Sequence, residues 1–578
     1  MNDTAKRGRN AELPMVWILS SWFALVIYFN PRFLAFLEIS PNIFVSFSVV
    51  AFIFCLNSFW FYAIYQGTMI FLSVRSRLLK REPRLTPLSE YPRVAVLYAT
   101  RNDFREDSLA TCLAIDYPNY RIFVLDDSTL PDYQRRVDRW VAAHSERASV
   151  IRRSDHRGFK AGNLNCAMRE LKGEYPYFMI CDADDFVAPD FINQLLPYFI
   201  ADPEVGFAQA KQEVNPKQDD AFAQAIGYRT NVHYRYFVRA RNEYGFVMFY
   251  GHGALISTKV WEAIGGFPEI VTEDLAFSAR VREYGYYGVY DERVVCYEDF
   301  PPTHGQLRTR TEKWIRGTTE YLRVGFPDLW RSKNVTWYEK ADVLINAFAH
   351  HQVPVMLLFL FVLGIVLPFA MGHFQFPGSF LIWPVPAGKT VFEYLIHIRH
   401  HVLWSSDFYI VMMLTMLVPL IPVIIDWCRH PMRVFRYLMV SQYVYLSSLV
   451  VDTVALGAYL VTRTAVFWNT YDAAHIHAQK VPGSKWLRTY HPNHPWVFAA
   501  EVMIAVILTT IAFITKNLWF IAPAMALYLS PVLYRVGWES RLMRALTYLP
   551  CLLALFIIGV VTLDLGMRWI ENWRILVL

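Results

Sequence analysis

YFMICDADD, residues 177–185, decides the fold of this chain, because an apolar run ends abruptly in three carboxylates. Such a short run is typical of a strand in a parallel sheet that is covered on both faces. Sheets of this kind bind their ligands at the carboxyl ends of the strands. Asp182 and Asp184 are two residues apart, so on an extended chain they point the same way and can hold a hard divalent cation. The alternative is an acidic helix cap formed by Asp184 or Asp185.

The same alternation continues on both sides of this stretch, from about residue 93 to residue 335. Short apolar runs at 94–98, 122–125, 149–151 and 177–180 are predicted strands, and 107–115 and 134–143 are predicted helices between them. Alternation of this kind predicts a parallel sheet with helices on both faces. We therefore expect one α/β domain at 93–335, preceded by a basic linker at 75–92.

The composition of the whole chain is more apolar than that of an ordinary soluble protein. Of its 578 residues, 54% are hydrophobic and only 18% are charged, whereas soluble domains are about half apolar and a quarter charged. This contrast indicates a soluble domain set between membrane segments. The net charge of +6 lies partly beside those segments, so it indicates membrane topology and not nucleic-acid binding. The seven cysteines show neither metal-site spacing nor a disulfide framework.

Apolar segments long enough to cross a membrane flank the α/β domain. Two precede it within residues 1–74, and five lie within residues 336–578. Basic residues follow the second segment directly, which predicts that this end and the N-terminus are cytoplasmic. Residues 1–13 are polar and lack the features of a secretory signal. The seven predicted spans are 14–28 (with apolar residues resuming at 33), 43–74, 353–371, 408–425, 497–514, 518–533 and 546–565, and 372–407 is expected to be external.

Residues 438–461 are ambiguous, since they are long enough to span but contain several polar side chains, among them Asp452. Counting them as a span would place the basic stretch 534–544 outside. We therefore predict an interfacial helix at 438–461.

Five further motifs lie in the chain at characteristic spacing. They are Ala99–Asp103, Leu125–Ser128, Lys160–Asn165, Thr272–Asp274 and Arg310–Trp314. Their order resembles that of membrane-embedded, processive glycosyltransferases of family 2, the group of cellulose, chitin and hyaluronan synthases. The resemblance implies a nucleotide-sugar-binding, GT-A-like α/β domain inserted in a multi-span helical membrane domain.

The resemblance also implies a donor-binding role for several of these residues. Asp182 and Asp184 would hold Mg²⁺ or Mn²⁺ together with the donor diphosphate. Asp126 and Asp127 would contact uracil and ribose, although residues in this position also form turns at strand ends. Thr100 and Asn102 occupy the family's first-strand loop, but their neighbours differ from the usual pattern. Lys160 would bind phosphate at the start of a helix, the alternative being a solvated lysine.

The Thr272–Asp274 motif would carry the catalytic base. Asp274 would take the proton of an acceptor hydroxyl, and Glu273 would contact the acceptor. A single base with direct attack implies inversion, so an α-linked donor gives a β-linked product. The same residues could also cap the helix that follows.

Arg310–Trp314 departs most from the family pattern, Gln-x-x-Arg-Trp. Arg310 replaces the Gln and Lys313 replaces the Arg, so the acceptor pocket is more basic. Trp314 is retained and can stack on the acceptor sugar. Lys313 and Arg316 would offset diphosphate charge. The alternative is an amphipathic surface helix with a buried Trp.

A last, shorter resemblance lies in a loop at residues 464–496. Trp486 and Thr489 are similar to residues of a cytoplasmic gating loop that closes over the donor, whereas Arg488 stands where the family has Val. A cluster of histidines nearby has irregular spacing, so we do not interpret it as a metal site.

These features together imply an inverting, processive β-glycosyltransferase that polymerises sugar from a UDP-sugar, with glucose favoured, and passes the polysaccharide across the membrane. The alternative is a non-processive enzyme that adds one sugar to a lipid. A transporter or assembly subunit with an inactive domain fits poorly with the complete set of carboxylates. The expected partners are the UDP-sugar, the growing polysaccharide, membrane lipids and accessory export subunits, but no nucleic acid. The expected location is a bacterial inner membrane, with the catalytic domain in the cytoplasm.

Overall fold

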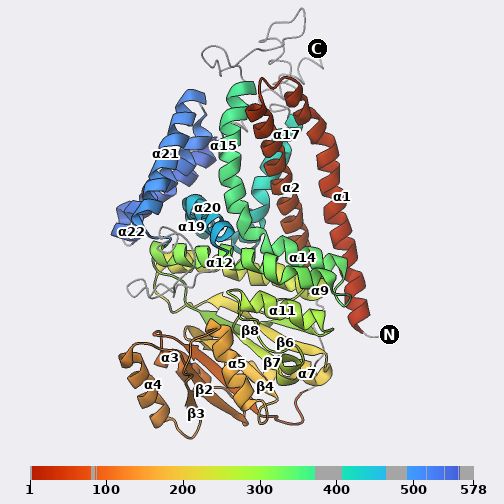
Figure 1. Ribbon diagram of the computed structural model, residues 1–578, viewed down its shortest axis with the longest axis vertical. Coiled ribbons are helices and arrows are strands. Elements are labelled where there is room, and N and C mark those ends of the chain that lie inside the picture. Colours follow the sequence, from red (N-terminus) through yellow and green to blue (C-terminus); the bar gives the residue numbers. More distant parts are fainter. Residues whose placement is uncertain are drawn as a thin grey trace, which may run out of the picture.

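The four apolar runs that were predicted to be strands belong to one eight-stranded sheet in a computed structural model of the chain. The structure describes residues 3–79, 85, 87–370, 406–463, 491–515, 517–538, 540–557 and 559. The sheet and its helices form a domain below an array of long helices (Figure 1). The strands are β1 (Val94–Thr100), β2 (Tyr120–Asp126), β3 (Ala148–Ile151), β4 (Tyr177–Asp182), β5 (Asp185–Val187), β6 (Val205–Val214), β7 (Ala254–Ser257) and β8 (Tyr287–Glu298).

The strand order is β3-β2-β1-β4-β7-β6-β8-β5. The first four strands are parallel, as predicted, but β7 pairs antiparallel with both β4 and β6, and β5 pairs antiparallel with β8. The parallel pairing predicted from the first four strands is therefore confirmed, whereas the other half of the sheet is mixed, since β6 and β8 pair parallel. The antiparallel strands were not predicted, because β7 and β5 are only four and three residues long and strand direction depends on pairing that the local pattern does not show.

Helices cover both faces of the sheet, as the alternation predicted. On one face α3 (Glu106–Leu113) and α4 (Pro131–Ala143) bury Leu109 and Trp140. On the other face α5 (Phe159–Leu171), α10 (Thr258–Ala263) and α11 (Glu273–Glu283) bury Leu164, Val260 and Phe277. The remaining domain helices are α6 (Phe191–Leu195), α7 (Pro197–Ala201), α8 (Ala221–Val232), α9 (Arg239–Tyr244), α13 (Phe326–Arg331) and α14 (Trp337–Ala347).

Helix α12 (His304–Val324) runs across the boundary between the domain and the long helices (Figure 1). Its residue Arg308 is buried there and forms an ion pair with Glu501 of α21 (Pro495–Thr515). The same guanidinium donates hydrogen bonds to the Asn493 side chain at 3.0 Å and to the Ser530 hydroxyl at 2.9 Å. One arginine therefore joins α12 to both α21 and α22, since Ser530 lies in α22 (Ile521–Val536).

Seven helical segments of the described chain are long and apolar enough to cross a membrane, which identifies the chain as an integral membrane protein. They are Glu12–Glu38, Ile43–Leu78, Ala349–Pro368, Asp407–Trp427, Pro431–Thr462, Pro495–Thr515 and Leu518–Val536. Six of them coincide with predicted spans. Residues 541–557 are also helical, but the predicted span 546–565 extends beyond the residues that the structure describes.

The segment Pro431–Thr462 consists of two helices, α19 (Pro431–Ser447) and α20 (Leu449–Thr462). It meets the length and hydropathy criteria for a span, whereas we predicted an interfacial helix at 438–461. In Figure 1 the pair is strongly foreshortened just above α12, while α2 (Ile43–Leu78) and α15 (Gln352–Ala370) stand upright. Helix α19 contacts α8, and α20 contacts α12. Helix α20 also contacts α15, and α19 also contacts α22, so the contacts of the pair do not decide between the two positions. The interfacial position stays a prediction.

Candidate functional site

The carboxyl ends of three neighbouring strands lie at one edge of the sheet. In the strand register Thr100 of β1 pairs with Asp126 of β2, and Ala99 pairs with Asp182 of β4. The polar residues that follow each apolar run are therefore brought together. This is the edge at which open α/β sheets bind ligands.

Asp182 forms an ion pair with Lys160, which lies in the first turn of α5. Gly158 precedes that helix with φ of 73°, so the chain turns sharply just before the lysine. Burial raises the pKa of Asp182, but Lys160 and His252 outweigh it and hold the pKa below the usual value. Burial alone would lower the pKa of Lys160. The charges of Asp182 and Glu273 outweigh burial and hold the pKa above its usual value. Lys160 is thus a charged group of the site, and the alternative of a solvated helix-start lysine is wrong.

Asp184 lies in the short turn between β4 and β5. Burial, together with the charges of Asp185, Asp182 and Glu298, raises the pKa of Asp184 to about 8. Crowded oxygen donors are the ligands that Mg²⁺ and Mn²⁺ prefer, and the binding of a divalent cation by Asp182 and Asp184 stays a prediction. The alternative of a helix cap is wrong, because the next helix begins at Phe191 with Asp190 at its N-cap position.

His252 is a member of this site that the sequence analysis missed. Its Nδ1 lies 2.7 Å from Oδ1 of the buried Asp185, and its Nε2 lies 3.9 Å from Oε2 of Glu298. Burial lowers the pKa of His252, but Asp185 more than compensates and raises it to about 10. Asp185, His252 and Cys296 also lie close enough together to hold a metal ion. The signal in the sequence that could have indicated it is the Gly251-His252-Gly253 triplet. In the structure both glycines have positive φ.

Glu273 and Asp274 open helix α11 beside the same site. Burial and the neighbouring Asp274 raise the pKa of Glu273 to about 7, and burial raises that of Asp274. The backbone N–H of Leu275 donates to Asp274 Oδ1 at 2.8 Å, which leaves Oδ2 for another partner. A Cβ at Gly251 would lie 3.8 Å from Lys160 Nζ and 4.0 Å from Asp274 Oδ2, so a single small space adjoins both groups.

The cap alternative holds for Asp274, which accepts a first-turn N–H of α11, but not for Thr272. Thr272 makes no side-chain cap to α11, and its hydroxyl instead donates to the Gly317 carbonyl of α12 at 3.1 Å. The motif therefore joins α11 to α12, the two helices that carry the predicted catalytic and acceptor residues.

Asp126 and Asp127 are each bonded to an arginine that follows β3. Arg152 Nε lies 2.7 Å from Asp126 Oδ2, and the Asp126 side chain is fully buried. Arg153 contacts both carboxylate oxygens of Asp127, with Nε at 2.9 Å from Oδ1. Contact with uracil and ribose stays a prediction. For such a contact each carboxylate must either bind the nucleoside while it keeps its arginine or release the arginine. The sequence did not indicate these two arginine contacts.

Thr100 and Asn102 shape the loop after β1. The Thr100 hydroxyl donates to Asp103 Oδ1 at 2.8 Å. Asn102, with φ of 61°, accepts from the backbone N–H groups of Thr129 and Leu130, both at 3.0 Å. Both side chains therefore hold the loops around the strand ends, and a role in base binding stays a prediction.

Helix α12 brings the Arg310–Trp314 motif to the opposite wall of the site. Arg310 Nη2 lies 3.4 Å from Glu298 Oε2, and its guanidinium carbon lies 4.9 Å from the centroid of the Trp314 ring. The charge of Lys313 acts on Asp182, Glu273 and Asp274, which places it near them.

Arg316 lies elsewhere on the same helix. It is buried and forms an ion pair with Glu312 at 2.7 Å. Burial raises the pKa of Glu312 to about 7. The structure thus assigns Arg316 an intrahelical partner, and its predicted part in diphosphate binding has no support from this contact. Trp486, Arg488 and Thr489 of the predicted gating loop lie outside the described residues.

Comparison with known proteins places these features among sugar transferases. Residues 177–560 match the model of the family described as "Glycosyl transferase family group 2". Glucomannan 4-beta-mannosyltransferase 7 of Arabidopsis thaliana is 26% identical over 294 residues, which cover 48% of this chain. The match covers 52% of that relative, so the chain spans about half the length of the curated relative it matches.

Solved structures of other proteins show weaker similarity. A mannosyltransferase, PcManGT from Pyrobaculum calidifontis, in complex with GDP-Man and Mn²⁺, has 18% identity and a TM-score of 0.41. That match covers 67% of this chain and 99% of the other. TarS of S. aureus has 14% identity and a TM-score of 0.30, over 48% of each chain.

Proposed function

Because this chain belongs to glycosyl transferase family group 2 and is a membrane-embedded glycosyltransferase, we propose that it is an inverting, processive β-glycosyltransferase fed by a nucleoside-diphosphate sugar. The observation that carries the proposal is the small space at Gly251, which adjoins both Lys160 and Asp274. A positive group for the leaving diphosphate and a carboxylate for the acceptor hydroxyl would then serve one reaction centre.

The donor would be held at the carboxyl ends of β1, β2 and β4. Asp182 and Asp184 would bind Mg²⁺ or Mn²⁺, and the cation would supply charge neutralisation for the diphosphate as it leaves. Lys160 and Lys313 would supply further positive charge, because both act on the same carboxylates. His252, paired with the buried Asp185, would fix the position of the strand end that carries them.

Asp274 would act as the general base. Its Oδ1 is held by a backbone N–H, so its Oδ2 can accept the proton of the acceptor hydroxyl. The acceptor oxygen then bonds to the anomeric carbon as the bond to the diphosphate oxygen breaks. A direct displacement of this kind inverts the anomeric centre, so an α-linked donor gives a β-linked product. Glu273 would hydrogen-bond the acceptor beside it.

The acceptor would lie along α12, with Trp314 as a stacking surface. Processive extension and transfer of the polymer across the membrane are supported by the position of α12. It lies between the site and the long helices and is joined to them through Arg308 (Figure 1). The second candidate is transfer of one sugar to a lipid. The cation–π contact of Arg310 with Trp314 favours that candidate, since the arginine occupies part of the ring surface.

The donor expected from the sequence is UDP-glucose. The name of the Arabidopsis thaliana relative makes a mannosyl donor the competing candidate. We propose that the α/β domain lies in the cytoplasm and the long helices in a bacterial inner membrane, with accessory export subunits as partners. Basic residues at the domain end of α2 support this orientation.

A donor panel would test these proposals. Purified protein in lipid would receive radiolabelled UDP-glucose, UDP-N-acetylglucosamine and GDP-mannose in separate reactions. The product would then be sized and digested with linkage-specific hydrolases. Long β-linked polymer from one donor supports the proposal, whereas label that extracts only into organic solvent supports transfer to lipid. Asp274→Asn is the negative control for both results.

A further inference from the structure

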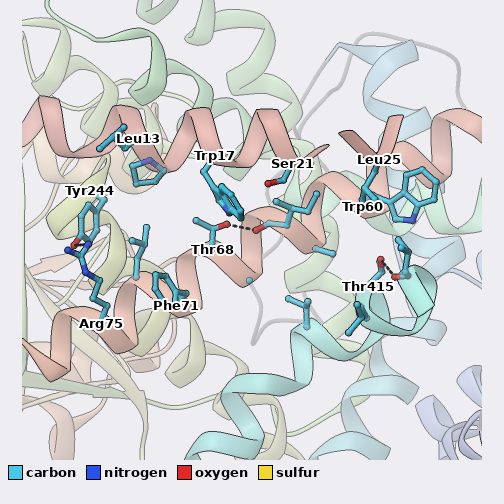
Figure 2. Close-up of a pocket in the computed structure, with 18 residues that line it drawn as sticks. Leu13, Trp17, Ser21, Leu25, Trp60, Thr68, Phe71, Arg75, Tyr244 and Thr415 are labelled. Carbon is cyan, nitrogen blue, oxygen red and sulfur yellow. Dashed lines mark hydrogen bonds between the residues drawn. The ribbon is translucent and has the colours of Figure 1, made fainter. Parts of the chain in front are cut away.

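A mainly apolar cavity of about 860 Å³ opens between three of the long helices, away from the site described above. It lies between α1 (Asp3–Glu38), α2 and α17 (Ser406–Leu417), with side chains from all three along its walls (Figure 2). Trp17 points from α1 toward α2 beside Thr68. Trp60 and Leu25 close the end that lies far from the α/β domain.

The walls offer an occupant few free hydrogen-bonding groups, one of which is the buried Trp60 Nε1, which has no partner in the described part of the chain. The Thr68 hydroxyl donates to the Ile64 carbonyl at 2.8 Å, and the Thr415 hydroxyl donates to the Val411 carbonyl at 2.7 Å. Both hydroxyls are thus satisfied within their own helices. A cavity with such walls suits hydrocarbon better than a sugar or a column of water.

One end of the cavity is different, because it carries a positive charge. Arg75 lies there, solvent-exposed, and donates to the Tyr244 hydroxyl at 3.2 Å (Figure 2). No carboxylate within the described part of the chain forms an ion pair with it. The guanidinium therefore has donors available for an anionic group at the cavity mouth.

The length of the cavity matches one leaflet of a bilayer. On α1 it extends from Leu13 to Leu25, which corresponds to about 18 Å of helix. Half of a hydrocarbon core is about 15 Å thick. The charged end coincides with the domain side of α2, where Tyr244 of α9 contributes to the wall.

We propose that this cavity binds one membrane phospholipid, with an acyl chain between α1 and α2 and the phosphate at Arg75. The lipid belongs to the leaflet that faces the α/β domain. An acyl chain fills the apolar length, and the phosphate supplies the anion that Arg75 lacks. Because Arg75 and Tyr244 come from a membrane helix and a domain helix, the bound headgroup bridges the two parts. This inference is independent of the donor and the acceptor.

Two substitutions test the two halves of the site. Gly67 lines the cavity, and a Cβ there would meet Val418 at 3.7 Å, an ordinary contact, so Gly67→Ala should fold and Gly67→Leu should fill the space. Arg75→Gln removes the charge alone. The matched control is Arg433→Gln, an exposed arginine at the start of α19 that lies outside the cavity wall.

Native mass spectrometry of the detergent-purified full chain, titrated with phosphatidylglycerol, gives the readout. The wild type should retain one lipid, as should Gly67→Ala and Arg433→Gln. Arg75→Gln should bind about fivefold more weakly, the factor that one basic side chain contributes near anionic lipid. Gly67→Leu should lose the retained lipid. Equal retention by all variants, or a lipid-linked sugar as the retained species, would overturn the proposal.

A second measurement does not depend on the folding of a filled variant. A photoreactive benzoylphenylalanine replaces either Trp17, in the cavity, or Phe23, which is 51% exposed on the same helix and outside it. After purification in detergent without added lipid, illumination should cross-link a phospholipid at position 17 and not at position 23. Detergent as the only cross-linked species at position 17 would contradict the proposal.

Discussion

The guanidinium of Arg310 lies over the ring of Trp314, 4.9 Å from its centroid, and reaches Glu298 of the active site with its other end. It also lies 4.6 Å from the centroid of the Phe300 ring. In the family motif a Gln takes the place of Arg310, and no cation would then cover this ring. The departure from the family pattern therefore changes the surface that is available to an acceptor sugar.

Trp314→Ala is expected to shorten the product more than it weakens donor binding. Stacking on an aromatic face contributes about 0.5–1.5 kcal/mol, so its loss should increase dissociation of the growing chain several-fold. Gel filtration of the product measures this. Trp330→Ala is the control, because Trp330 is exposed and also carries a nearby cation, Lys340. Polymer of normal length from Trp314→Ala would favour the lipid acceptor. Arg310→Gln should lengthen or redirect the product if the contact tunes the acceptor.

Transfer is expected to require a divalent cation. Asp184 lies among Asp185, Asp182 and Glu298, which together with burial raise its pKa to about 8, and a diphosphate would add further negative charge. Chelation should abolish turnover, and Mg²⁺ or Mn²⁺ should restore it. Asp184→Asn should lose turnover by orders of magnitude with an unchanged melting temperature. Full activity in excess chelator would refute the cation site.

Asp274→Asn is expected to bind nucleotide normally and to stop transfer, since removal of a general base costs about 10²–10⁴-fold in rate. Calorimetry with the nucleotide diphosphate measures binding, and a transfer assay measures the rate. Loss of binding together with transfer would assign Asp274 a structural role instead.

The pH dependence of the transfer rate is a second test of the role of Asp274. Burial raises the pKa of Asp274, and a base works only when it is deprotonated. The rate should therefore fall as the pH drops through this raised pKa, at a higher pH than for an ordinary aspartate. The residual activity of Asp274→Asn should lack that acid limb.

The position of α19 and α20 can be tested by labelling from each side of the membrane. Cys428 is exposed just before α19, and Arg463 ends α20. With an interfacial pair, an impermeant thiol reagent should label Cys428 and a cysteine at position 463 from the same side. Labelling from opposite sides would show that Pro431–Thr462 spans and that the predicted topology is wrong.

Glu501→Gln is expected to destabilise the junction between α12 and the long helices. Glu501 is the buried ion-pair partner of Arg308, and removal of one member of a buried pair costs about 3–5 kcal/mol. The melting temperature in detergent should fall by several degrees. Asp328→Asn, which breaks the exposed pair with Arg331, is the control and should leave it unchanged. Equal melting temperatures for both variants would mean that this ion pair does not stabilise the junction.

The sequence by itself determined the half of the sheet whose strands can be recognised from a short run of adjacent residues. Strands β1 to β4, helices α3 and α4, and the carboxylates at 182–185 could be predicted because apolar runs and their polar ends are read from adjacent residues. Six of the spans could be predicted for the same reason, since length and hydropathy are properties of one segment.

Only the tertiary structure decided which charged side chains pair with one another. Asp126 and Asp127 pair with Arg152 and Arg153 because β2 and β3 are neighbours in the sheet. His252 and Glu298 reach the carboxylates through β7 and β8, from parts of the chain that lie far away in sequence. The sequences of β7 and β8 do not indicate where these strands lie in the sheet, because strand pairing and register depend on packing against the whole sheet. Side-chain partners, and with them the ionisation of the site, therefore follow from the fold and not from the motif.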